Sequence, residues 1–172
     1  EFPWWPNADY LDFTESLGAL RTAGDFYRAS GFWTPFFHDI MDLFGLEDYF
    51  LNMYTHPDVV HAVTDRICGF YYEANERFYR VAAPLINGFF FGNDFGTQLD
   101  LILSPEHFDE FILPWFRRFT EQGHDWGFQV ILHSCGSIYR VINRLIEARV
   151  DCLHPIQALA RNMDARSLAG NY

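Results

Sequence analysis

Apolar residues recur along the chain in two patterns that alternate with each other. Short runs rich in Phe, Val, Ile and Leu predict buried strands, and longer stretches with apolar residues three or four positions apart predict helices. Such runs predict strands over residues 85–91, 128–132 and 150–153, and a partial alternation of apolar and polar positions predicts another over residues 25–30. The predicted helices cover residues 36–44, 47–53, 55–82, 104–119 and 138–148, and a last helix begins at Met163.

Several boundaries of these elements carry their own signals. Gly45 is expected to end the helix over 36–44. Thr55, followed by Pro57, is expected to cap the long helix. Ser104 and Pro105 mark another helix start, and Pro114 inside the same apolar pattern should kink or split that helix.

The order of strand and helix repeats, which predicts α/β units with a parallel sheet and helices outside it. Three predicted strand ends are followed by polar residues, namely Asp94 and Gln98, His133 and Cys135, and His154 and Gln157. Polar groups at successive strand ends favour the mouth of a TIM-type (β/α)8 barrel over a doubly wound sheet. The sequence contains neither a Gly-x-Gly-x-x-Gly motif nor a Walker loop.

Only about half of such a barrel can be counted in the 172 residues, which we expect to form one domain. Residues 1–24 form an irregular leading segment, with a helical turn within 12–23, and residues 25–172 hold the barrel units. A complete barrel needs eight strands and roughly 250 residues. We therefore expect either that further strands belong to a longer protein, as a first residue other than Met suggests, or that a homo-oligomer covers the open edges.

Charge and composition exclude some classes of partner. The net charge is −11 and all twelve cationic residues are Arg, so binding to the phosphates of nucleic acid is not expected. No apolar run reaches the ~18 residues of a membrane span, and no signal peptide opens the chain. Three cysteines are an odd number, which favours free thiols in a reducing, cytoplasmic location. Of these, Cys68 and Cys152 are expected to pack in the core.

The segment His133-Ser134-Cys135-Gly136 carries the strongest chemical signal, because it follows a predicted buried strand. An imidazole nitrogen and a thiolate sulfur are both good zinc ligands. The alternative is a buried His and a buried free Cys without a metal.

The other polar strand ends leave similar choices open. Asp94 either faces the barrel mouth and binds substrate or a ligand, or it caps a turn. Gln98 is either surface or a site contact, and His154 is either a further ligand or a hydrogen-bonding wall. Gln157 is expected to line the pocket. At most Phe89–Phe91 among the aromatic residues are expected to line the barrel.

Five segments together resemble the uroporphyrinogen decarboxylase (URO-D) superfamily over roughly residues 25–172. They are Asn93-Asp94-Phe95-Gly96-Thr97-Gln98, Leu103-Ser104-Pro105-Glu106-His107-Phe108, Leu113-Pro114-Trp115, Val130-Ile131-Leu132-His133-Ser134-Cys135-Gly136 and Ile156-Gln157. The resemblance implies a (β/α)8 barrel of which this chain is the middle.

Within that superfamily, the chain is more similar to the corrinoid-linked methyltransferases, which carry a zinc-binding His-x-Cys where this chain has His133 and Cys135. The resemblance implies zinc, a corrinoid carried by a partner, and methyl transfer to a thiol or folate-type acceptor. It places the third zinc ligand, a Cys, beyond Tyr172. The alternatives are decarboxylation of uroporphyrinogen, a tetrapyrrole-type substrate, and a non-catalytic fragment or assembly module.

Overall fold

The computed structural model describes residues 8–172 and contains a four-stranded sheet, in which all strands run parallel. The strands are β1 (Ala29–Ser30), β2 (Gly88–Gly92), β3 (Gln129–His133) and β4 (Cys152–His154), and their order in the sheet follows the chain. The first seven residues of the predicted irregular leading segment, 1–24, lie outside the described residues. An α/β architecture with a parallel sheet is confirmed and is consistent with a partial TIM barrel.

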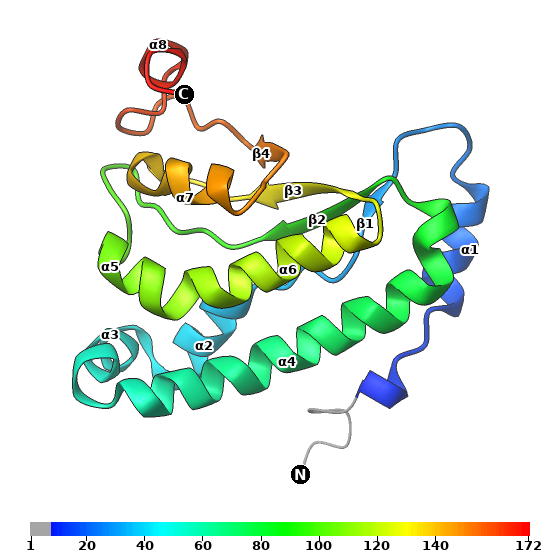
Figure 1. The fold of residues 1–172 in the computed structure, drawn as a ribbon, viewed down its shortest axis with the longest axis horizontal. Helices are drawn as coiled ribbons and strands as arrows, with labels where there is room; N and C mark the ends of the chain where they lie inside the picture. The colour runs from blue at the N-terminus through cyan, green and yellow to red at the C-terminus, as the bar shows by residue number, and fades with distance from the viewer. Residues whose placement is uncertain (1–7) are drawn as a thin grey trace.

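Helices connect the strands and cover one side of the sheet. The α-helices are α1 (Thr14–Thr22), α2 (Phe36–Phe44), α3 (Leu46–Thr55), α4 (Pro57–Ala82), α5 (Pro105–His107), α6 (Leu113–Asp125), α7 (Ile142–Glu147) and α8 (Ala165–Ala169). Short 3-10 turns span Ala8–Tyr10, Ala83–Leu85 and Tyr139–Val141. Figure 1 shows α4 and α6 running side by side along the sheet. None of the helices within residues 8–172 combines the length and apolar character that crossing a bilayer requires.

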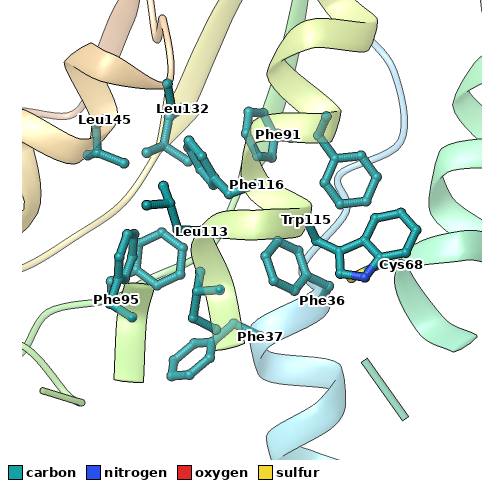
Figure 2. Close-up of a cluster of buried hydrophobic side chains, with 14 of the residues drawn as sticks. Phe36, Phe37, Cys68, Phe91, Phe95, Leu113, Trp115, Phe116, Leu132 and Leu145 are labelled. Carbon is teal, nitrogen blue, oxygen red and sulfur yellow. The ribbon is translucent and has the colours of Figure 1, made fainter. Parts of the chain in front are cut away.

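The two faces of the central strands differ because successive side chains of a strand point in opposite directions. Phe89, Phe91, Val130 and Leu132 form the covered face, and each is fully buried. Phe91 contacts Phe116 of α6, with ring centroids 5.3 Å apart. Figure 2 shows both rings in the cluster of buried side chains that joins the sheet to its helices.

The open face of the sheet consists of Phe90, Ile131, His133, Cys152 and His154, which the strand register places next to one another. Each of these residues is half-buried or exposed. Phe89 and Phe91 lie on the covered face, so the expectation that Phe89–Phe91 line a barrel is wrong for these two and stays a prediction for Phe90.

Cys152 is exposed, so its predicted place in the core is wrong. It lies on β4, which is an edge strand among the described residues, and its side chain belongs to the open face. Cys68 is buried in α4, as expected.

Helix boundaries follow the sequence signals in most places. The side chain of Ser104 accepts a hydrogen bond from the backbone N–H of His107 at 3.2 Å, so the predicted cap is confirmed. A π-helical segment, Phe108–Ile112, separates α5 from α6, because Pro114 lacks the N–H that a continuous helix needs there.

Two expectations about other boundaries are wrong. Thr55 does not cap α4: it ends α3, and its hydroxyl donates to the carbonyl of Leu51. The predicted strand over 25–30 shortens to β1, Ala29–Ser30, since only these two residues pair with β2.

Candidate metal centre

The carboxyl ends of β2, β3 and β4 lie next to each other and bring together residues that are distant in the sequence. The register pairs Gly92 with His133 and His133 with His154. Asp94 follows the end of β2 by two residues, and Cys135 follows the end of β3 by two residues. The edge of the sheet is thus the place where the predicted site residues converge.

Asp94, His133 and Cys135 form a cluster of three potential metal ligands, whose donor atoms all lie within 4.8 Å of one another. The Nε2 atom of His133 is 3.4 Å from the Cys135 Sγ atom and 3.5 Å from the Asp94 Oδ1 atom. Bonds of about 2.0–2.3 Å at tetrahedral angles separate two zinc ligands by roughly 3.3–3.6 Å. The two distances from His133 therefore match those between zinc ligands, the third separation lies within 4.8 Å, and with these three ligands a fourth coordination position would stay open.

The loop that presents Cys135 is held by close contact with the loop after β2. Gly136 has a φ of 83°, and a Cβ atom there would lie 2.2 Å from the carbonyl oxygen of Gly96. Its N–H donates to the Oε1 atom of Gln157 at 2.7 Å. Ser134 is buried, and its Oγ atom accepts a hydrogen bond from the Phe95 N–H. Only glycine fits at position 136, since both the backbone conformation and the space exclude a side chain.

Asp94 both faces the cluster and links two loops. Its Oδ1 atom accepts a hydrogen bond from the Cys135 N–H at 2.7 Å, so the carboxylate joins the two loops. Its own N–H donates to the Nε2 atom of His38 on α2 at 3.0 Å. The carboxylate thus makes a contact between loops rather than the local turn cap that the sequence left open.

A buried amide anchors this loop to α2. Asn93 is 1% exposed; its Oδ1 atom accepts a hydrogen bond from the Phe37 N–H, and its Nδ2 atom donates to the Thr34 carbonyl. Sequence reasoning missed both Asn93 and His38. The available signals were an amide directly before Asp94 and a polar residue at the start of a Phe-rich helix.

The imidazole of His133 lies between an indole and a second imidazole. The ring centroids of Trp33 and His133 are 5.4 Å apart. The indole packs on Gly92, where a Cβ atom would lie 2.1 Å from it. On the other side, the Nδ1 atoms of His133 and His154 are 3.1 Å apart. The position of the ring is thus set from two directions.

Burial is the main reason why the pKa of the Cys135 thiol is raised, and the Asp94 carboxylate raises it further through its charge and a hydrogen bond. In the absence of a cation the thiol is therefore protonated at neutral pH. A divalent ion must displace that proton, so metal binding is expected to release a proton and to become tighter as the pH rises.

The other predicted site residues differ in how they contact this cluster. His154 contacts His133, and Gln157 supports the loop at Gly136. Gln98 is exposed, and its backbone carbonyl accepts a hydrogen bond from the Arg161 N–H, which does not belong to the cluster. A third ligand in the form of a late Cys stays a prediction, whereas Asp94 supplies a third donor within residues 8–172.

Residues 36–171 match the family model described as Uroporphyrinogen decarboxylase (URO-D). No curated protein and no solved structure matches the chain.

Proposed function

Because the chain belongs to the uroporphyrinogen decarboxylase family, we propose that it is a zinc-dependent methyltransferase of that family. It moves a methyl group between a corrinoid protein and a thiol or folate-type acceptor. The observation that supports this proposal is the cluster of Asp94, His133 and Cys135, in which both distances from His133 Nε2 match those between zinc ligands.

In this proposal Asp94, His133 and Cys135 hold the zinc ion through one oxygen, one nitrogen and one sulfur atom. Three protein ligands and an open fourth position are typical of catalytic rather than structural zinc sites. A zinc ion there would supply the positive charge that keeps an incoming thiol in its nucleophilic thiolate form at neutral pH.

The protein's own side chains contribute the shape and the electrostatics of the site. Trp33 and Phe90 lie edge to face, with ring centroids 5.2 Å apart, and both are partly exposed beside His133. They offer an apolar surface on which the non-reacting part of an acceptor can pack. Asp94 adds a negative charge, which offsets the charge of a divalent cation and disfavours an anionic substrate in its absence.

The same cluster separates this proposal from its alternatives. Decarboxylation of uroporphyrinogen requires no zinc, so metal removal would leave that activity intact. An assembly module would require neither zinc nor a tetrapyrrole. The three hypotheses therefore predict different activities for the same metal-depleted protein.

The test compares zinc content and methyl transfer from methylcobalamin to 2-mercaptoethanol in the wild type, in His133→Ala and in His56→Ala. His56 is an exposed histidine outside the cluster and serves as the matched control. We expect about one zinc per chain and methyl transfer in the wild type and in the control, and neither in His133→Ala. Folded wild-type protein without zinc, full activity of His133→Ala, or turnover of uroporphyrinogen by metal-free protein would each contradict the proposal.

A further inference from the structure

The contact between His133 and His154 constrains which nitrogen of each ring carries a proton. Their Nδ1 atoms are 3.1 Å apart, within hydrogen-bond distance. Two neutral imidazoles can bond through these atoms only if one donates an N–H and the other offers a lone pair. The tautomers of the two rings are therefore coupled to each other.

The surroundings of the second His133 nitrogen decide the direction of this bond. The Nε2 atom lies 3.4 Å from the Cys135 Sγ atom, on the side of the ring that faces the cluster. The nearest carboxylate oxygen, Asp94 Oδ1, already accepts the Cys135 N–H at 2.7 Å and lies 3.5 Å from Nε2, at the outer limit of a hydrogen bond. When Nε2 binds a cation through its lone pair, the proton of the neutral ring sits on Nδ1, from which it can be donated to His154.

We infer that His154 is a positioning residue, whose Nδ1 atom accepts a hydrogen bond from the Nδ1–H of His133 and keeps the Nε2 lone pair of His133 directed at Asp94 and Cys135. This inference rests on the proposed function, because it gives His154 the task of supporting a metal ligand rather than contacting substrate. Histidines that bind a metal usually donate their other N–H to a fixed acceptor, which sets the orientation of the ring and increases its basicity.

The aromatic residues around the pair hold both rings in place. Phe90 lies edge to face with His154, with ring centroids 5.6 Å apart. Trp33 contacts His133 on another side. His154 itself is exposed, so its Nε2–H can be satisfied by solvent without a further protein partner. No further protein group is therefore needed to satisfy the hydrogen-bonding atoms of His154.

The first test measures zinc affinity by competition with a chelator in the wild type, His154→Phe and His154→Asn. The phenyl ring retains packing on Phe90 but cannot accept a hydrogen bond, so we expect affinity to fall by about 10- to 100-fold. The amide oxygen of Asn can accept from His133, so we expect it to recover most of that loss. His56→Phe, far from the cluster in sequence and exposed, should bind zinc as the wild type does. Equal affinity in His154→Phe and the wild type would overturn the inference.

The second test reads the His133 tautomer directly, by long-range 1H–15N NMR of the metal-free protein at alkaline pH. We expect the proton on Nδ1 in the wild type and a mixture of tautomers in His154→Phe. A proton on Nε2 in the wild type would overturn the inference. If the wild type binds no zinc, the proposed function fails, yet the NMR result still decides the direction of the hydrogen bond.

Discussion

Helices bury one face of the sheet completely, whereas the other face stays partly open and leads to the candidate metal centre. Phe89 and Phe91 on the covered face are 0% exposed, while Phe90 between them is half-buried. The three residues are the same amino acid on the same strand, so the difference arises from what packs against each side. We therefore expect the covered face to contribute mainly stability and the open face, with its strand ends, to carry the proposed chemistry.

The largest effect is expected from removing an aromatic ring on the covered face. Phe91→Ala should lower the free energy of unfolding by about 3–5 kcal/mol, because it leaves a cavity against Phe116. Phe90→Ala, the matched change on the open face, should cost clearly less. Chemical denaturation of both variants measures the difference, and equal losses would contradict the distinction between the two faces.

A side chain at Gly136 should disturb both stability and the metal centre. The Cβ of Gly136→Ala would meet the Gly96 carbonyl, and the positive φ adds backbone strain, so we expect a loss of about 2–4 kcal/mol. Zinc affinity should fall as well, because Cys135 moves with the loop. Gly127→Ala provides the control, since its φ is also positive but nothing lies within 4 Å of the added atom. Equal losses of zinc affinity in both variants would show that the contact between Gly136 and Gly96 is not the cause of the loss.

Asp94→Asn should affect the metal rather than the fold. The amide oxygen can still accept the Cys135 N–H, so the free energy of unfolding should change by less than about 1 kcal/mol. The loss of the anionic ligand should weaken zinc binding by at least about tenfold, or roughly 1.4 kcal/mol. Calorimetric zinc titration beside thermal unfolding separates the two effects. Unchanged zinc affinity in Asp94→Asn would show that Asp94 is not a zinc ligand.

The smallest effect is expected at an ion pair on the helical side, where Arg144 of α7 binds Asp109 through two hydrogen bonds. The guanidinium lowers the pKa of the Asp109 carboxyl below its ordinary 3.8, so the pair stabilises the fold above that pH, and the effect is lost as the pH falls through the lowered pKa. Both side chains are partly exposed, so Arg144→Gln should cost only about 0.5 kcal/mol at pH 7.

The measurement for this pair is the free energy of unfolding at pH 7 and near pH 2. Arg140→Gln serves as the control, because Arg140 forms a single, longer contact of 3.4 Å with Asp100. The difference between Arg144→Gln and the wild type should shrink at the lower pH. A difference that grows instead would show that the pKa shift has the opposite sign.

Local patterns predicted the order of the elements well, since periodicity and caps are encoded within a few residues. The helix over Phe36–Phe44 and the cap at Ser104 are examples. Exposure of Cys152 could not be predicted, because an apolar strand looks the same whether its neighbours cover one face or both. The length of β1 could not be predicted either, because it depends on which of its residues pair with β2.

The candidate site was predictable only in part for a related reason. His133 and Cys135 stand close together in the sequence, and their placement after a strand is a local feature. The roles of His38, Asn93 and Trp33 depend on contacts with segments more than 50 residues away or across a strand, such as the hydrogen bond from the Asp94 N–H to His38. No spacing in the sequence signals such contacts.

X-ray absorption spectroscopy at the zinc edge tests the central claim most directly, because it counts the sulfur ligands of the bound metal. With Asp94, His133 and Cys135 as the ligands, the spectrum of the zinc-loaded wild type should show one sulfur at about 2.3 Å and nitrogen or oxygen neighbours at about 2.0–2.2 Å. The sulfur should disappear in Cys135→Ser. Two sulfurs would show that a second Cys takes the place given to Asp94, and a spectrum without sulfur would contradict the metal centre itself.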